Sequence, residues 1–86
     1  MDLAERARAF LASGGEGLLA PACAARRNGE PAQAVEVAAV LRGATADDLG
    51  VKRNLVFLQW QRGEAKGAAV LAWDQDGHVT ALDVWD

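Results

Sequence analysis

This chain of 86 residues has few of the side chains from which catalytic and metal centres are built. It contains no tyrosine, one cysteine (Cys23) and one histidine (His78). A single cysteine excludes a disulfide within the monomer, and a single histidine excludes a metal site built on two histidines. The sequence has no cofactor-binding motif and no cluster with metal-ligand spacing. We therefore expect neither a metal nor a cofactor.

Positive charge is also scarce, because 9 Lys and Arg face 12 Asp and Glu, which gives a net charge of −3. This balance argues against a nucleic-acid partner, since such binding depends on neutralising phosphates. No apolar run approaches the roughly 20 residues that a membrane-spanning helix needs. The N-terminus does not resemble a secretory signal, and a lone thiol fits a reducing compartment. We expect one soluble, cytoplasmic domain over residues 1–86.

The N-terminal segment predicts a helix over residues 2–12. Asp2 can accept hydrogen bonds from the first helical turn, with Glu5 three residues later, as in a capping box. Leu3, Ala7, Phe10 and Leu11 form one apolar stripe at helical spacing, and Gly14-Gly15 end the helix. Residues 16–20 are expected to form a second, short helix, which Pro21 complicates.

The middle of the chain is ambiguous. In residues 32–42, Val35 and Val37 alternating with Glu36 favour a strand, whereas the alanines favour a helix, and we prefer the strand because β-branched residues cluster there. Residues 43–53 are expected to be a loop, with a possible helical turn at 45–49.

The C-terminal third gives the clearest pattern. Three strands are predicted, at 54–61, 66–73 and 78–85, joined by turns at Gly63-Glu64 and Asp76-Gly77. An Asp-Gly pair between alternating segments is a strong hairpin signal. The chain is therefore expected to be an α+β protein, with N-terminal helices on one face of a curved antiparallel sheet that ends in a three-stranded meander.

The alternation divides this meander into two faces, both largely apolar. An exposed sheet face ordinarily alternates to polar side chains, so each face requires a cover. The face chosen for the core carries Val56, Leu58, Trp60, Ala69, Leu71, Trp73, Thr80, Leu82 and Val84. The other carries Leu55, Phe57, Gln59, Ala68, Val70, Ala72, Val79, Ala81, Asp83 and Trp85.

Two segments resemble a known family. Leu18-Leu19-Ala20-Pro21 is similar to the end of the second helix, and the run from Asp76-Gly77 to Trp85-Asp86 is similar to the terminal strand, of SnoaL-like proteins with the nuclear-transport-factor and ketosteroid-isomerase cone fold. The resemblance implies dimers through the sheet and a ligand cavity between sheet and helices. Because this chain is shorter than most members, it implies a shallow pocket or none. It does not imply one chemistry.

The second face supplies the candidate site residues. Asp83, among Val70, Ala81 and Trp85, would be partly desolvated, which suits a general base, and the resemblance adds that isomerase-type members keep an acid in the pocket. An ion pair or a dimer rim is the more ordinary role for this carboxylate. Phe57, Gln59, Val70 and Trp85 are the ligand or interface candidates, because exposed aromatic surface is enriched at such places.

Three functions fit these observations. The preferred one is a sheet-mediated homodimer that binds an apolar small molecule or a protein partner. The second is an acid–base enzyme of the isomerase or cyclase type that uses Asp83. The third is an acidic protein-interaction module.

Overall fold

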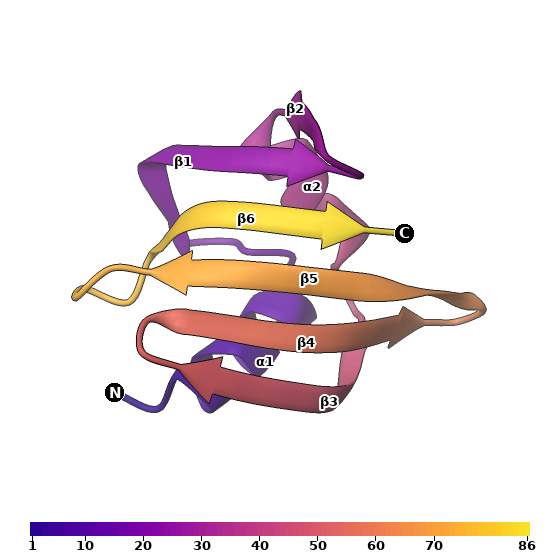
Figure 1. The fold of residues 1–86 in the computed structure, drawn as a ribbon, viewed down its shortest axis with the longest axis horizontal. Coiled ribbons are helices and arrows are strands. Elements are labelled where there is room, and N and C mark those ends of the chain that lie inside the picture. Colours follow the sequence, from indigo (N-terminus) through magenta and orange to yellow (C-terminus); the bar gives the residue numbers. More distant parts are fainter.

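The computed structural model describes all 86 residues as two helices and one six-stranded sheet. The sheet is curved and open, and both helices lie behind it (Figure 1). The strands follow the order β2-β1-β6-β5-β4-β3, in which only the β1–β6 pair is parallel. The elements are α1 (Leu3–Ser13), β1 (Leu19–Arg27), β2 (Glu30–Ala32), α2 (Ala34–Val40), β3 (Thr45–Lys52), β4 (Leu55–Arg62), β5 (Ala65–Trp73) and β6 (Val79–Trp85). The α+β class is confirmed.

Helix α1 forms as its sequence predicts. The Asp2 side chain accepts a hydrogen bond from the Glu5 N–H at 3.2 Å and caps the first turn. Gly14 ends the helix at a φ of 68°, and its N–H donates to the Phe10 carbonyl. Ala7, Phe10 and Leu11 are buried, so the predicted stripe faces the sheet.

The predicted second helix at 16–20 is wrong, because the chain leaves a glycine-rich loop and enters strand β1 at Leu19. This strand exists because it pairs with β6, which lies about sixty residues later in the chain and which local sequence does not reveal. Pro21 is tolerated because the pairing with β6 is irregular between Leu19 and Ala24, and β2 pairs only with the last three residues of β1.

Residues 34–40 form helix α2, so the preferred strand over 32–42 is wrong and the alternative is correct. Ala34, Val37, Ala38 and Leu41 lie at i, i+3, i+4 and i+7, and they pack into the core or against it. This helical spacing of apolar residues indicates a helix, and its burial outweighs the preference of the β-branched residues for a strand. Arg62 of β4 supports the last turn by donating to the carbonyls of Ala39 and Arg42, each at 3.2 Å.

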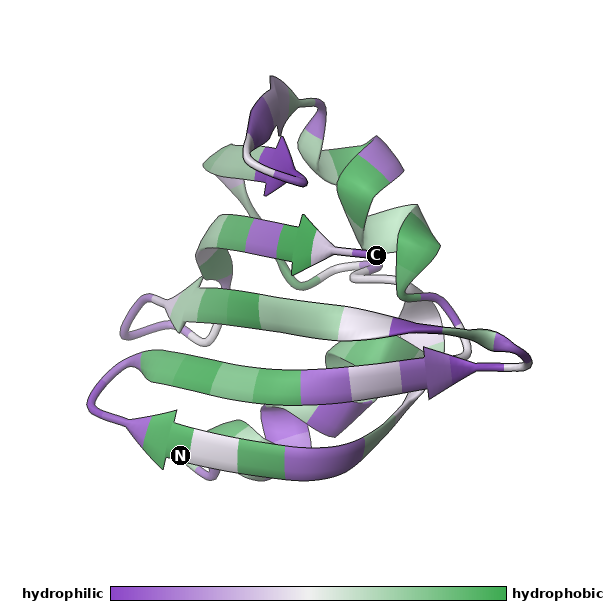
Figure 2. Cartoon of the chain, turned by 45° about the vertical axis from the view of Figure 1, so that its right-hand side comes forward, coloured by the Kyte–Doolittle hydropathy of each residue, from purple (hydrophilic) through white to green (hydrophobic).

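The expected loop over 43–53 is also wrong. Thr45–Lys52 is strand β3, which pairs along its whole length with β4, apart from an irregularity between Ala46 and Asp48. The predicted three-stranded meander is therefore confirmed and extended by one strand. Figure 2 shows that β5 and β6 are hydrophobic for much of their length, whereas the turn between β4 and β5 is hydrophilic.

The predicted core face is buried beneath the two helices with one exception. Trp60 and Trp73 are both nearly inaccessible, whereas Trp85 lies on the opposite face. The register between β5 and β6 shifts between Ala72 and Trp73, so that Trp73 pairs with Val79. This shift turns Val79 into the core and Thr80 out to solvent, the reverse of the prediction for these two residues.

Neither helix has the length and apolar character that a membrane crossing requires. Helix α1 packs mainly on β3 and β4, and α2 packs on β1 and β6. Both contribute to the same face of the sheet, so no element of the chain covers the other. We call this uncovered surface the outer face.

Candidate functional site

The register of the strands places the predicted site residues together on the outer face. Phe57 lies beside Val70, and Val70 lies beside Asp83 on the next strand. Arg26 of β1 extends this row beyond Asp83. In the neighbouring row, Gln59, Ala68 and Trp85 lie side by side.

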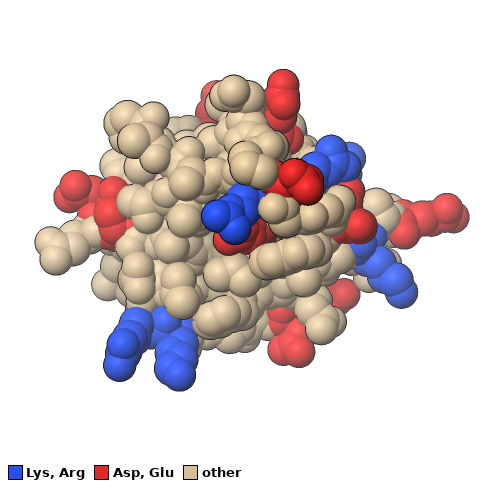
Figure 3. All heavy atoms as spheres, turned by 45° about the horizontal axis from the view of Figure 1, so that its top comes forward, with Lys and Arg blue, Asp and Glu red and all other residues tan.

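The centre of the outer face is apolar and open to solvent. Phe57 is 43% exposed and Trp85 is 42% exposed, on either side of half-buried Val70. Leu55, Ala68, Ala72 and Ala81 are half-buried around them. Contiguous apolar surface of this kind, on a face that no element covers, is characteristic of interaction sites. Figure 3 shows uncharged atoms over most of the visible surface, with acidic and basic groups in small clusters.

Asp83 lies on this open face and not in a cavity. Its cross-strand neighbour Arg26 carries the opposite charge, although the two side chains do not form an ion pair. None of the five principal clefts of the molecule is lined by Asp83. The Asp83 residue is half-buried, next to Val70 of the neighbouring strand.

The space between the sheet and the helices is filled by side chains. Phe10 and Leu11 of α1, Leu41 at the end of α2 and the tryptophans of β4 and β5 belong to one buried cluster. Trp60 donates its indole N–H to the Ala68 carbonyl at 3.1 Å, whereas the indole nitrogen of Trp73 has no partner. The principal clefts accordingly lie at the surface.

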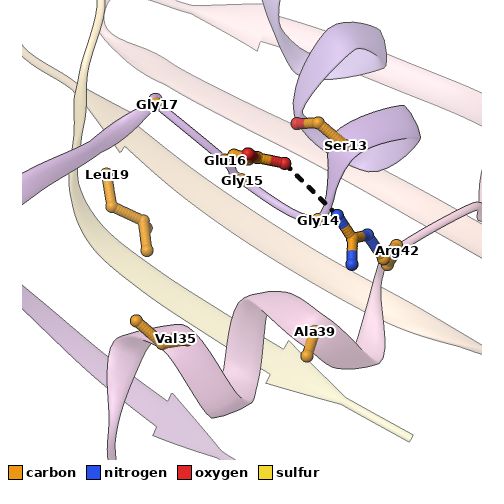
Figure 4. Close-up of a pocket in the computed structure, with 9 residues that line it drawn as sticks. All are labelled: Ser13, Gly14, Gly15, Glu16, Gly17, Leu19, Val35, Ala39 and Arg42. Carbon is orange, nitrogen blue, oxygen red and sulfur yellow. Dashed lines mark hydrogen bonds and ion pairs between the residues drawn. The ribbon is translucent and has the colours of Figure 1, made fainter.

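The largest cleft opens between the end of α1 and helix α2 and has a volume of about 500 Å³. Figure 4 shows Leu19, Val35 and Ala39 on its walls and the Glu16–Arg42 ion pair, 3.3 Å long, across one side. The remaining lining residues are Ser13, Gly14, Gly15 and Gly17. This volume lies within the range of small-molecule sites in proteins.

The shape of the cleft comes from the glycine-rich loop that follows α1. Gly15 and Gly17 have φ values of 81° and 74°, which other residues rarely adopt. A Cβ on Gly15 would lie 2.8 Å from the Phe10 ring, so the loop can sit directly on the core. Ser13 beside it has a buried hydroxyl with no hydrogen-bond partner.

Sequence reasoning did not identify this cleft. Its residues come from two separate segments, 13–19 and 35–42, and residues 32–42 were expected to be a strand. The positive-φ glycines after α1 were the only local signal. No group of His, Cys, Asp and Glu side chains, in the cleft or elsewhere, is arranged to hold a metal ion.

The fold resembles several solved structures. A candidate isomerase of the SnoaL-like family from Agrobacterium tumefaciens superposes with a TM-score of 0.66 and 12% identity, over 96% of this chain and 92% of that one. An uncharacterised bacterial protein with a cystatin-like fold from Silicibacter pomeroyi superposes with a TM-score of 0.65 and 18% identity, over 98% of this chain and 72% of that one. A protein described as "Rd1NTF2_04 with long sheet" superposes with a TM-score of 0.60 and 13% identity, over 95% of each chain.

No protein-family model matches the chain, and no curated protein matches it significantly. The structural matches have low sequence identity, so they establish the fold alone. The open curved sheet, the helices on one of its faces and the terminal strand after Asp76-Gly77 agree with the resemblance, whereas Leu18-Leu19-Ala20-Pro21, compared there with the end of a second helix, leads into strand β1. This chain has the SnoaL-like, nuclear-transport-factor-like cone fold.

Proposed function

We propose that this protein is a binding module that forms a homodimer by packing the outer face of one copy on that of another. The observation that carries the proposal is the exposure of Phe57 and Trp85 around Val70 on an otherwise uncovered sheet. Large aromatic side chains of this kind are the usual energetic centres of interfaces. A second copy would remove them from water.

The charges of the outer face are compatible with self-association. Arg26 and Asp83 are neighbours of opposite sign at one end of the central row, and the rest of that row, Val70 and Phe57, is apolar. Two such faces can approach without a large like-charge repulsion. An isologous contact of this kind also gives a closed dimer, which is the commonest homo-oligomer.

The test is sedimentation velocity over a concentration series, with the variant Val70→Glu. A carboxylate at the centre of the face would be buried without a partner in the dimer, so we expect the variant to associate at least tenfold more weakly. Gln75→Glu is the matched control, because it adds the same charge in the exposed turn between β5 and β6, off the outer face. Equal association of Val70→Glu and the unaltered protein would contradict the proposal.

Fluorescence gives a readout specific to this face. Trp60 and Trp73 are each 2% exposed, so acrylamide quenching reports chiefly on Trp85. We expect quenching to decrease with protein concentration in the unaltered chain and to stay constant in Val70→Glu. An interface elsewhere on the molecule would leave quenching independent of concentration.

A second proposed activity is the binding of a small, mostly apolar molecule in the cleft between α1 and α2. It is favoured by the 72% exposure of Val35 on one wall and by the volume of the cleft, about 500 Å³. The probe is anilinonaphthalene sulfonate, whose fluorescence increases in apolar surroundings. We expect Ala39→Trp, which fills the cleft, to remove the part of the increase that arises there while the part from the exposed outer face remains, and Val51→Thr, an exposed position outside the cleft, to leave the whole increase unchanged.

Acid–base catalysis by Asp83 is the weaker alternative, because this carboxylate lines none of the five principal clefts. A dimer would have to supply the missing walls. Asp83→Asn separates the two roles, since an enzyme would keep its fold and lose turnover, whereas a rim residue would change only association.

A further inference from the structure

The two edges of the sheet differ in how they are protected from other chains. Strand β2, at one edge, has three residues and contains Pro31, so it offers little for another strand to pair with. Strand β3, at the opposite edge, has eight residues and no proline. It lies last in the strand order, and Figure 1 shows no segment beyond it. The irregularity at Asp47 disturbs only its first half.

The second half of β3 has a charge order that is complementary to itself. Its sequence is Asp48-Leu49-Gly50-Val51-Lys52, which carries the acid at one end and the base at the other. When two copies of this segment run antiparallel about Gly50, Asp48 of each copy lies opposite Lys52 of the other. Opposite charges directly across a strand pair are stabilising, and like charges are destabilising. Pairing in parallel would place like charges together.

Gly50 is a glycine that the single chain does not explain. Its φ is not positive, and a Cβ built on it would meet nothing within 4 Å. Glycine inside a strand weakens the strand unless a bulge, a bend or the close approach of another backbone requires it. The irregularity of β3 lies three residues earlier, at Asp47 between Ala46 and Asp48. The absent side chain leaves the surface around Gly50 open at the point where two copies would place Gly50 opposite Gly50.

The open edge of β3 also offers a second copy of this strand free backbone hydrogen-bonding groups and an exposed apolar side chain. Lys52 pairs with Leu55 across a two-residue turn, a pair that exchanges both backbone hydrogen bonds. Because such pairs alternate along an antiparallel ladder, Leu49 and Val51 direct their N–H and C=O groups to the free edge. Val51 is 48% exposed, although it is a large hydrophobic residue. In the self-paired arrangement, Leu49 of one copy lies opposite Val51 of the other.

We propose that the β3 edge is a second self-association site, at which residues 48–52 of two copies pair antiparallel and join their sheets into one. This contact is separate from the outer face, since it uses the backbone of the edge. It does not depend on the proposed outer-face dimer.

The test uses charge reversal at the two ends of the segment. Asp48→Lys places lysine opposite lysine in a self-pair, and Lys52→Asp places aspartate opposite aspartate. Each single variant should self-associate about tenfold or more weakly than its parent. Mixed together, the two variants restore both opposite-charge pairs and should form a heterodimer. The double variant Asp48→Lys, Lys52→Asp should associate with itself like the parent.

All of these variants are made in the Val70→Glu background, where the outer-face contact is removed, and are measured by sedimentation velocity from micromolar to millimolar concentration. Circular dichroism verifies that each variant is folded. The same reversals are also made in the chain that keeps Val70, where they test the outer face independently. In that chain Asp48→Lys weakens only the edge contact, so an outer-face dimer should remain. The failure of one proposal is thus distinguishable from the failure of the other.

Hydrogen exchange gives a second, residue-level readout. The amides of Leu49 and Val51 should exchange more slowly as the concentration of the Val70→Glu protein rises, and this dependence should vanish in Asp48→Lys, Val70→Glu. The proposal is overturned if the Val70→Glu protein stays monomeric at millimolar concentration. It is also overturned if the single reversals associate as well as their parent, or if their mixture does not associate.

Discussion

The ring of Phe10 on α1 meets the ring of Trp73 on β5 edge-on, with centroids 6.2 Å apart and planes at 82°. This contact joins the first helix to the centre of the sheet. Arg6, one turn earlier on α1, places its guanidinium 5.9 Å from the Trp73 ring centre and donates to the Gly77 carbonyl. Helix α1 is thereby fixed to both β5 and the turn that follows it.

Truncation of this aromatic contact should destabilise the fold strongly. Phe10 is completely buried, so we expect Phe10→Ala to lower the free energy of unfolding by about 3–5 kcal/mol. Phe57→Ala is the matched control, because it removes the same side chain from a position that is 43% exposed, and its effect on the monomer should be much smaller. Urea unfolding followed by tryptophan fluorescence, at concentrations where the chain is monomeric, measures both. Similar losses in the two variants would contradict this account of the core.

Gly67 should not tolerate any side chain. A Cβ at this position would lie 1.9 Å from the Trp85 carbonyl oxygen, which belongs to the backbone of β6. Gly67→Ala must therefore push β6 away from β5, and we expect a loss of about 3 kcal/mol or more, as for other strongly overpacked sites. Gly50→Ala is the control, with an expected change within about 0.5 kcal/mol in the monomer. Thermal unfolding of the two variants would show a large decrease in Tm for the first alone.

Acid should destabilise the protein through two carboxylates. The backbone N–H groups of His78 and Asp76 hold the pKa of Asp74 below its usual value of 3.8, each by a hydrogen bond of 2.9 Å. Arg27 and Asn28 lower the pKa of Asp86 in the same way. A lowered pKa in the folded state gives stability that is present above pH 3.8 and is lost as the pH falls through the folded value.

The measurement is Tm between pH 6 and pH 2. We expect the decrease below about pH 4 to be shallower in the double variant Asp74→Asn, Asp86→Asn. Asp47→Asn is the control, because Asp47 makes no side-chain hydrogen bond or ion pair, and it should retain the full decrease. An unchanged acid profile in the double variant would refute the assignment.

The thiol of Cys23 should react slowly in the folded protein. Burial raises the pKa of this thiol above 9.0, so the fraction of thiolate at pH 8 is smaller than in a free cysteine. We expect Ellman's reagent to modify Cys23 several-fold more slowly in the native chain than in guanidinium chloride. A native rate equal to that of the unfolded chain would place the thiol in open solvent.

The sequence by itself determined the elements whose signals are local. The cap at Asp2, the stripe through Phe10, the glycine stop at Gly14 and the hairpin turns depend on residues within a few positions of one another. The alternation along β4 and β5 placed Trp60 and Trp73 together on the core face correctly, because one two-residue turn fixed their relative register.

Tertiary structure decided the elements that exist through distant pairing. Strands β1 and β3 have mixed, alanine- and charge-rich sequences, and each forms because it lies beside another strand. The shift that buried Val79 depended on how β6 meets β5. The cleft lined by Val35 required the position of α2 against the loop after α1. Local propensity is a small energy, and burial against a neighbouring element outweighs it.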